Sequence, residues 1–318
     1  AKTVTSDTGI TAPYDRLVIA TGSNPFIIPL PGHDLRGVMV YRDLDDVDQM
    51  IAESAKPEAK AVVIGGGLLG LEAAAGLKMQ GMDVTVLHLM PTLMERQLDE
   101  ASGHLLEQAL IDRDIKIMTQ ASTDHIAGDS KVEKVVLKDG TELDADIVVM
   151  AVGIRPSKAL AEEIGLETEH GIIVDDCLRT SDPDIFALGE CVQHRGQCYG
   201  LVAPLYEMAR VLADTLMGEQ AAYAGSVTAT KLKVTGVDLY SAGDFADAED
   251  REEIVLRDAS AGIYKRLVLK DNCIIGAVMY GDTADGPWFF DLLKKATDIS
   301  EMRDTLIFGQ AYQGGEPL

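Results

Sequence analysis

The segment AVVIGGGLLGLEAAAGLKMQGMDVTVL, Ala61–Leu87, decides the fold that this sequence predicts. It starts with Ala61–Ile64, an apolar run of the kind that a strand buried on both faces requires. A Gly-x-Gly-x-x-Gly pattern follows at Gly65–Gly70, where the strand must turn into a helix. Leu69–Gln80 is the expected helix, and Val84–Leu87 is the expected second parallel strand. The segment therefore predicts a strand–helix–strand unit of the dinucleotide-binding type.

The three glycines of the pattern have different expected tasks. Gly65 permits the tight turn, Gly67 lets a pyrophosphate approach the backbone, and Gly70 allows the helix to pack closely on the strand. The free N–H groups near Leu68, at the positive end of the helix, would hold the phosphates. A glycine-rich turn without a ligand is the less favoured interpretation, because a strand, a helix and a strand surround the pattern.

His88 stands where this type of unit usually carries an acid. That acid, ~20 residues after the glycines, binds the adenosine ribose of NAD. A neutral imidazole can accept from or donate to a ribose hydroxyl, and a protonated imidazole tolerates a 2′-phosphate. The choice between NADH and NADPH therefore stays open at His88.

The composition describes an ordinary globular chain with many acidic residues. The 318 residues are 47% hydrophobic and 25% charged, which allows two or three domains with a core each. The formal net charge of −24 argues against a nucleic acid or an anionic membrane surface as the partner. No apolar stretch reaches the ~18 residues that a membrane span needs. We therefore expect no nucleic acid and no membrane among the partners.

The cysteines show no metal motif. Neither a zinc pattern nor four-thiolate iron–sulfur spacing occurs among Cys177, Cys191, Cys198 and Cys273. We expect no metal ligands in this chain and a reduced, cytoplasmic setting. Cys191 and Cys198 are interpreted as ordinary buried thiols rather than a redox pair, because six residues separate them.

Periodicity and turn residues predict the other elements. Helices are expected at Asp43–Ser54, Asp99–Arg113, Leu205–Met217 and Pro287–Ala296. Strands are expected in a hairpin at Lys2–Thr11 and at Arg16–Ala20, Val132–Leu137, Thr141–Leu143, Ile147–Val152, Gly171–Val174, Ile185–Leu188, Lys231–Tyr240 and Lys265–Met279. The strands at Arg16–Ala20 and Ile147–Val152 are expected to be buried. Turns are expected at Asp139-Gly140, as part of a hairpin, and at Asp271-Asn272, between the last two strands. The order predicts an α/β protein with doubly wound, Rossmann-like domains, followed by a small α+β domain of about 90 residues.

Some segments have an expected structural role or two open interpretations. The apolar face of the first helix is expected at Leu44, Val47 and Ile51, and the acidic run Glu249–Glu253 is interpreted as a solvated loop. The methionines expected to fill the core are Met90, Met94 and Met118. For Trp288–Phe290, docking of a partner domain and core packing of the last helix are both open.

Three strand-end sequences stand in order along the chain: RLVIATGSNP at 16–25, VVIGGGLLGLEAA at 62–74 and DPDIFALGE at 182–190. Together they resemble the flavoprotein pyridine nucleotide–disulfide oxidoreductase family, whose members bind FAD and NAD(P)H in two related doubly wound domains. HLMPTLMERQLD at 88–99, ALGECVQHRGQCYGLVAP at 187–204 and the segment 285–315 narrow the resemblance further. They are similar to the N-terminal flavoprotein part of assimilatory NAD(P)H nitrite reductase large subunits.

The resemblance covers essentially the whole chain and implies its domains. These are a partial FAD-binding domain at 1–56, an NAD(P)H-binding Rossmann domain at 57–152, a return to the FAD-binding domain at 153–224, and a C-terminal α+β domain of the rubredoxin reductase kind at 225–318. The family's first glycine motif, which holds the FAD pyrophosphate, does not occur in this sequence. We therefore expect an upstream strand–helix–strand unit to be missing and FAD binding by this chain to be weak or absent.

The resemblance also implies roles for single residues. Those expected beside FAD are Thr21, Gly22, Ser23, Arg42, Gly189, Glu190 and Pro204, the last at the start of a helix whose positive end faces the flavin. Those expected around NAD(P)H are Gly65, Gly67, Leu68, Leu69, Gly70 and Gly153. Glu72 is expected to be the catalytic residue that faces the nicotinamide and the isoalloxazine, although an acid there also suits the helix dipole.

Glu190 stands where the wider family has an aspartate that binds the flavin ribityl chain, and glutamate is typical of the nitrite reductase branch. An unpaired carboxylate directly after a buried strand would be costly, which also favours a ligand role. The redox cysteine pair of the disulfide reductases is not found in this sequence, so direct disulfide reduction has no support.

The implied activity is hydride transfer from NAD(P)H to FAD, followed by electron transfer to an iron–sulfur and sirohaem centre that reduces nitrite to ammonia. Those two centres would lie in downstream domains. The expected partners are NAD(P)H and these domains, or a small electron-acceptor protein, and a homodimer is also open. The alternatives are a stand-alone rubredoxin or ferredoxin reductase, an NADH oxidase, and a non-catalytic dinucleotide-binding scaffold.

Overall fold

A computed structural model describes residues 2–56, 58–234 and 236–313. The chain divides into two compact units. The first unit consists of Ala1–Phe26 and Gly153–Thr228, and the second consists of Ile27–Val152 and Ala229–Leu318. The C-terminal segment thus forms one unit with the segment that contains the glycine pattern, whereas the domain limits given above stay predictions.

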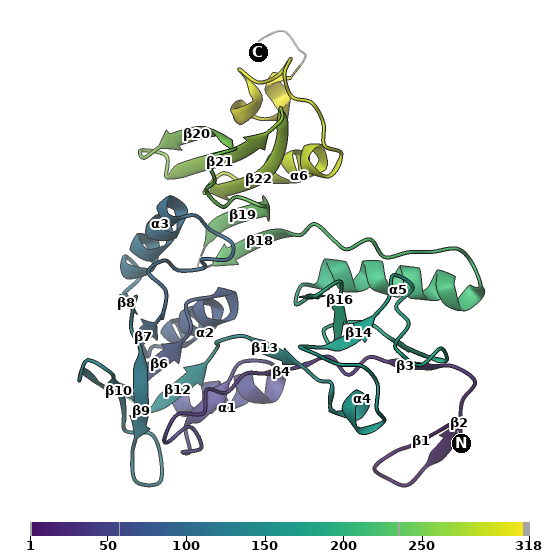
Figure 1. Ribbon diagram of the computed structural model, residues 1–318. Coiled ribbons are helices and arrows are strands. Elements are labelled where there is room, and N and C mark those ends of the chain that lie inside the picture. The colour runs from purple at the N-terminus through teal and green to yellow at the C-terminus, as the bar shows by residue number, and fades with distance from the viewer. Residues whose placement is uncertain (1, 57, 235, 314–318) are drawn as a thin grey trace. The chain divides into compact units, whose positions relative to one another are not determined.

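The second unit contains the predicted strand–helix–strand segment (Figure 1). It consists of β6 (Lys60–Ile64), α2 (Leu68–Met79) and β7 (Asp83–Leu87). Strands β6 and β7 belong to a parallel sheet in the order β5-β12-β6-β7-β8. The other three strands are β5 at Val38–Val40, β12 at Ile147–Met150 and β8 at Ile115–Met118. Side chains of β6 and β7 are buried from their second residue on, as the continuous apolar runs predict.

Helices and a small antiparallel sheet complete this part of the unit. The helices are α1 (Leu44–Ser54) and α3 (Glu100–Ile111). Both begin after an aspartate whose side chain accepts from a backbone N–H of the first turn, Asp43 in α1 and Asp99 in α3. The small sheet has the order β11-β10-β9, with β9 at Thr123–Ala127, β10 at Lys134–Leu137 and β11 at Glu142–Asp144.

The C-terminal part of the second unit is an antiparallel sheet in the order β18-β19-β22-β21-β20. Its strands are β18 (Ala229–Val234), β19 (Val237–Gly243), β20 (Glu252–Asp258), β21 (Ile263–Lys270) and β22 (Cys273–Tyr280). Helix α6 (Gly286–Lys294) and the 3₁₀ turns η1 (Leu306–Phe308) and η2 (Gln310–Tyr312) follow. Val278 and Leu239 share a core with Leu71 of α2, which joins this sheet to the parallel one.

The first unit contains several short paired strands and two helices (Figure 1). Its strands are β1 (Thr3–Thr5), β2 (Thr11–Pro13), β3 (Leu17–Ile19), β4 (Ser23–Pro25), β13 (Ile154–Pro156), β14 (Ile172–Val174), β15 (Ile185–Ala187), β16 (Val192–His194) and β17 (Gln197–Cys198). Its helices are α4 (Ala159–Glu163) and α5 (Val202–Met217). Strands β3 and β15 pair in parallel, whereas β4 and β13 pair antiparallel.

Several sequence-based expectations about burial were wrong. On α1, Leu44 is 80% and Ile51 is 47% exposed, because the helix buries Met50 against the core instead. Val18 in the middle of β3 is 38% exposed although the strand was expected to be buried. Met90 is also exposed, whereas Met94 is buried as expected.

Two further expectations were wrong, and one of the two open interpretations of Trp288–Phe290 is supported. The acidic run is not wholly a solvated loop, because Glu253 lies in β20 and forms an ion pair with the buried Arg266. Cys191 is buried as expected, but Cys198 is exposed, since β17 lies at the edge of its sheet. Phe289 is fully buried, so the last helix uses this ring for core packing.

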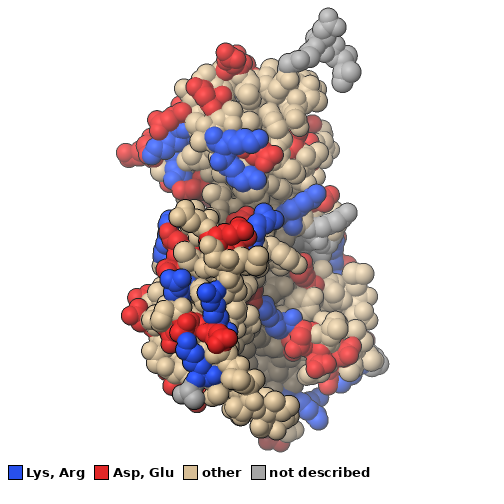
Figure 2. Space-filling model, turned by 90° about the vertical axis from the view of Figure 1, so that its right-hand side faces the viewer, with Lys and Arg blue, Asp and Glu red and all other residues tan. Residues whose placement is uncertain are grey.

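The charged residues are mixed on the surface. On the face drawn in Figure 2, Lys and Arg side chains are interspersed with Asp and Glu. The ion pairs between exposed side chains include Lys60 with Asp144 and Lys134 with Glu142. Within the described residues, no helix is long and apolar enough to cross a membrane.

Candidate functional site

The glycine pattern has two crowded positions and one open position. A Cβ on Gly65 would lie 2.3 Å from the Ala151 carbonyl oxygen, and Gly65 has a φ of +121°. A Cβ on Gly70 would lie 1.9 Å from the Gly65 carbonyl oxygen. A Cβ on Gly67, in contrast, would have no heavy atom within 4 Å. Gly65 and Gly70 are therefore required by packing, and Gly67 leaves space beside the backbone.

The open position lies at the start of a helix. Gly67 is the N-cap of α2, and no side chain caps this end, so the first N–H groups of the helix have no side-chain acceptor at the cap. Leu69 in the first turn is 39% exposed. A pyrophosphate fits this arrangement, because helix N-termini present N–H donors and a positive dipole end to anions.

His88 lies beneath the glycine loop. Its ring is buried, and its Nδ1 accepts a hydrogen bond of 3.0 Å from the Gly66 N–H. Its Nε2 lies 3.0 Å from the Thr92 carbonyl oxygen and 3.1 Å from Glu95 Oε2. Since Nδ1 accepts, Nε2 carries the proton and donates to these oxygens. Both ring nitrogens are thus engaged by the protein itself.

Glu72 lies on α2 one turn after the open glycine. The residue is exposed as a whole, but neighbouring protein atoms desolvate part of the carboxylate and raise the pKa of Glu72. A partly desolvated carboxylate close to a predicted cofactor site is the kind of group that functional sites contain.

In the first unit, the ends of β3 and β15 bring two predicted residues together. The Ser23 hydroxyl donates a hydrogen bond of 2.7 Å to Glu190 Oε2. The parallel pairing of β3 with β15 explains this contact, because parallel strands end at the same edge of a sheet. The Thr21 hydroxyl donates to the Ser157 carbonyl oxygen and so fixes the turn that precedes Ser23.

The backbone around this carboxylate is open. Gly22 and Gly189 have φ values of +66° and +94°, and a Cβ on either would have no heavy atom within 4 Å. The start of α5 has no side-chain cap, and the buried Pro204 lies in its first turn. A hollow of about 390 Å³ lies at this helix start, lined among others by Tyr199, Gly200, Leu201 and Pro204. A large anionic or polar group could therefore lie against this edge.

Two other predicted residues have less specific surroundings. Arg42 belongs to the second unit and lies just before α1, where its N–H donates to Asp46. Gly153 begins the second segment of the first unit, with a φ of +109°, and its carbonyl accepts from the Phe26 N–H. The roles of Arg42 and Gly153 towards a cofactor stay predictions.

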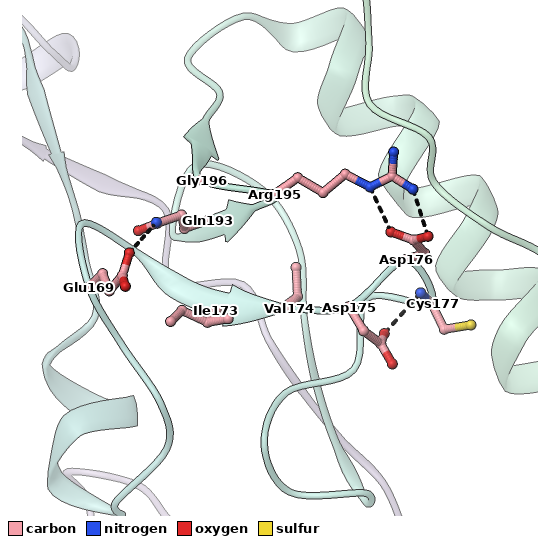
Figure 3. Close-up of a pocket in the computed structure, with 9 residues that line it drawn as sticks. All are labelled: Glu169, Ile173, Val174, Asp175, Asp176, Cys177, Gln193, Arg195 and Gly196. Atoms are coloured by element: carbon pink, nitrogen blue, oxygen red, sulfur yellow. Dashed lines mark hydrogen bonds and ion pairs between the residues drawn. The ribbon is translucent and has the colours of Figure 1, made fainter.

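A second hollow of about 640 Å³ lies in the first unit (Figure 3). It is lined by Glu169, Ile173, Val174, Asp175, Asp176, Cys177, Gln193, Arg195 and Gly196, none of which sequence reasoning selected. Arg195 forms a two-point contact with Asp176, and Gln193 donates to Glu169. The side chains mainly satisfy one another, which is typical of a structural polar cluster. Among the described residues, no group of three or more His, Cys, Asp and Glu is arranged to hold a metal ion.

Comparison with known proteins defines the class. The model of the family named Pyridine nucleotide-disulphide oxidoreductase matches residues 1–210, and that of the Rubredoxin NAD+ reductase C-terminal domain matches residues 229–297. The chain belongs to the pyridine nucleotide-disulphide oxidoreductase family, whose members are FAD-dependent NAD(P)H oxidoreductases. The α/β fold with a C-terminal antiparallel sheet agrees with this assignment.

Relatives within this class include nitrite reductases. The chain is 52% identical over 301 residues to "Nitrite reductase [NAD(P)H]" of Bacillus subtilis, which covers 94% of this chain and 37% of the relative. It is 41% identical to the "Assimilatory nitrate reductase electron transfer subunit" of the same organism, over 96% of this chain and 39% of the relative. A solved NAD-dependent persulfide reductase from A. fulgidus is 27% identical, with a TM-score of 0.85 over 95% of this chain and 61% of that one. The chain thus spans about two fifths of the length of these two curated relatives.

Proposed function

We propose that this chain is the flavoprotein module of an NAD(P)H-dependent nitrite reductase. In this role it takes electrons from NAD(P)H and passes them to an iron–sulfur and sirohaem centre outside residues 1–318, where nitrite is reduced to ammonia. The identity of 52% to a nitrite reductase across nearly the whole chain supports the choice of acceptor. The geometric support is the open space beside the backbone of Gly67. This residue stands between Gly65 and Gly70, where backbone carbonyl oxygens leave no room for a Cβ.

The second unit offers residues that fit a nicotinamide nucleotide. Gly65 and Gly70 set the shape of the loop, and Gly67, Leu68 and Leu69 present their backbone to the pyrophosphate. Glu72 follows on the same helix, and we assign it the position beside the reacting rings. The partial desolvation that raises its pKa suits a carboxyl group that holds or exchanges a proton there.

The first unit has residues that fit the flavin half of FAD. Glu190 offers a carboxylate already oriented by Ser23, and such an acceptor suits the hydroxyl groups of a ribityl chain. Gly22 and Gly189 keep the backbone open beside it, and the uncapped start of α5 near Pro204 suits the flavin edge that becomes negative. Thr21, Arg42 and Gly153 complete the proposed set. When bound, FAD and NAD(P)H together supply hydride transfer and the release of single electrons.

A stand-alone rubredoxin reductase is the second candidate. The match of residues 229–297 to the rubredoxin reductase C-terminal domain favours it specifically. The two candidates differ in the acceptor but share the proposed cofactor sites. The cytoplasmic location, a homodimer and a small acceptor protein as partner stay predictions in both cases.

Steady-state assays of the intact protein that contains this chain distinguish the acceptors. We expect anaerobic NAD(P)H oxidation to depend on nitrite and to yield ammonium at one per three NAD(P)H, since the reduction of nitrite to ammonia takes six electrons. Oxidation that depends on rubredoxin and ignores nitrite would favour the second candidate. Dinucleotide binding without oxidation by any acceptor or dye would favour a non-catalytic scaffold.

A further inference from the structure

The loop between β7 and α3 forms two hydrogen bonds to Gly66 of the glycine loop, one to its N–H and one to its carbonyl oxygen. The Gly66 N–H donates to His88 Nδ1 at 3.0 Å, and the Gly66 carbonyl accepts from the Met94 N–H, also at 3.0 Å. Leu93 and Met94 are buried, and Met94 has a φ of +53°. The residue after Met94 is therefore held at a defined place beside the glycine loop.

That residue is Glu95. One of its carboxylate oxygens lies 3.1 Å from His88 Nε2, which donates to it, while the Glu95 side chain is 35% exposed. A continuous chain of hydrogen bonds thus runs from the Gly66 N–H through the imidazole to the carboxylate. The carboxylate is oriented by the protein and still accessible from outside.

His88 itself is poorly suited to bind a ribose. Its side chain is 9% exposed and both ring nitrogens are engaged by protein atoms. The carboxylate that it holds lies beside the imidazole of the residue that directly follows β7. In this type of fold the acid that accepts the ribose 2′-hydroxyl also follows this strand. His88 is therefore placed to orient the Glu95 carboxylate rather than to bind a ligand itself.

We infer that Glu95 is the residue that makes this site select NADH over NADPH, with His88 as its positioning residue. This inference rests on the proposed dinucleotide site in the second unit. A carboxylate accepts hydrogen bonds from the 2′- and 3′-hydroxyls of an adenosine ribose. A 2′-phosphate at the same place would put like charges close together.

Isothermal titration calorimetry with ADP-ribose and 2′-phospho-ADP-ribose tests the role of Glu95. The test involves no redox chemistry, since neither probe contains nicotinamide. The wild-type chain should bind ADP-ribose more tightly than its 2′-phosphate. Glu95→Gln should reduce this ratio of dissociation constants by about tenfold, as expected for removal of one like-charge contact in a partly exposed site. Glu95→Arg should reverse the preference, because a guanidinium accommodates a 2′-phosphate.

Glu133→Gln is the matched control, because it removes the same charge from an exposed position of the same unit. It should leave the ratio at the wild-type value. Raising the salt concentration should weaken the wild-type discrimination and leave that of Glu95→Gln nearly constant. All variants should unfold at similar temperatures, because Glu95 and Glu133 are exposed and the Thr92 carbonyl oxygen still accepts from His88 Nε2 when Glu95 is replaced.

The inference would be overturned if both Glu95 variants kept the wild-type ratio of dissociation constants, or if the wild-type chain bound 2′-phospho-ADP-ribose more tightly than ADP-ribose. Either result would leave the proposed dinucleotide site itself intact. A wild-type chain that binds neither probe would overturn the dinucleotide site, and the role of Glu95 with it.

Discussion

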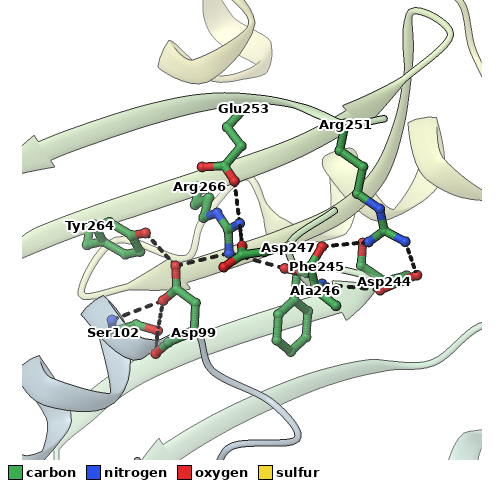
Figure 4. A network of polar contacts seen from close by, with 10 residues as sticks. All are labelled: Asp99, Ser102, Asp244, Phe245, Ala246, Asp247, Arg251, Glu253, Tyr264 and Arg266. Atoms are coloured by element: carbon green, nitrogen blue, oxygen red, sulfur yellow. Dashed lines mark hydrogen bonds and ion pairs between the residues drawn. The ribbon is translucent and has the colours of Figure 1, made fainter. Parts of the chain in front are cut away.

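The Tyr264 hydroxyl donates a hydrogen bond to the Asp99 carboxylate (Figure 4). This contact joins β21 of the antiparallel sheet to the start of α3 in the parallel-sheet part of the same unit. Asp99 also caps α3 through the Ser102 N–H and lies 3.4 Å from the Arg266 guanidinium. Burial, and then the bond to Asp99, raises the pKa of the Tyr264 phenol, so this group stays a donor through the ordinary pH range.

We expect Asp99→Asn to lower the free energy of unfolding of the second unit by about 2 kcal/mol. The variant removes the negative charge that faces the buried Arg266 and Tyr264, whereas asparagine can still cap α3. The loss stays moderate because Arg266 keeps Glu253 and Asp247 as partners. Tyr264→Phe should cost about 1 kcal/mol. Urea unfolding of both single variants and the double variant measures the coupling energy, with the exposed Asp48→Asn as control. Strictly additive losses would show that the negative charge of Asp99 contributes nothing to its contact with Tyr264.

The glycines of the cofactor loop should respond differently to alanine. Gly70→Ala should destabilise the chain by about 1–3 kcal/mol, because its Cβ would overlap the Gly65 carbonyl oxygen. Gly67→Ala should leave the melting temperature nearly unchanged and weaken dinucleotide binding, because the methyl group would occupy the open space.

Gly76→Ala provides the control on the same helix, since a Cβ there would also have no neighbour within 4 Å. It should raise stability by about 0.5–1 kcal/mol and leave binding intact. Thermal melts and titration of the three variants with ADP-ribose measure both effects. Unchanged binding by Gly67→Ala would remove the pyrophosphate from this loop.

Glu190→Ala should lower flavin occupancy of the intact protein and leave nicotinamide nucleotide binding unchanged. Loss of hydrogen bonds to a carboxylate costs about 1.5–3 kcal/mol, which corresponds to a dissociation constant for FAD about ten times higher or more. Ser23→Ala should have a smaller effect in the same direction, because it removes only the hydroxyl that orients Glu190. Flavin content per chain after gel filtration measures this, with the exposed Glu163→Ala as control. Wild-type flavin content in Glu190→Ala would refute its assigned role.

Acid should weaken the first unit through Asp176. Hydrogen bonds from Arg195 and then His194 lower the pKa of the Asp176 carboxyl from 3.8 to about 2. Because the folded-state pKa is depressed, the stabilisation is present above about pH 4 and is lost as the pH falls to about 2.

Asp176→Asn should therefore be less stable than the wild type near neutral pH, and the difference should shrink across that acidic window. Amide hydrogen exchange of β14 and β16, compared at equal pH, reports the local stability. Asp15→Asn, which changes an exposed aspartate of the same unit, is the control. A difference that stays constant down to about pH 2 would contradict the assigned pKa.

Local patterns predicted the elements that depend on neighbours in sequence. The unit β6-α2-β7 appears within one residue of its expected limits, because apolar runs and glycines act over short distances. The hairpin at Asp139-Gly140 and the turn at Asp271-Asn272 were likewise confirmed. Strand β9 was missed, since its segment Thr123–Ala127 carries polar residues and no clear alternation.

Contacts between distant segments could not be read from such patterns. The burial of Met50 in place of Leu44 depends on what packs against α1, and the pair Glu253–Arg266 depends on the register of β20 on β21. In the candidate site, sequence reasoning selected His88 but not Glu95, because only the folded loop brings that carboxylate to the imidazole. A resemblance to a family likewise implies roles for single residues, but it does not show which of these residues are in contact.

The most direct test of the proposed function is the visible absorption spectrum of the intact protein, loaded with FAD, during anaerobic titration with NADH. We predict that the flavin band bleaches at one NADH per bound FAD, and that Gly67→Ala requires much higher NADH concentrations for the same effect. A protein that retains FAD but keeps its full absorbance with excess NADH and with excess NADPH would contradict the account.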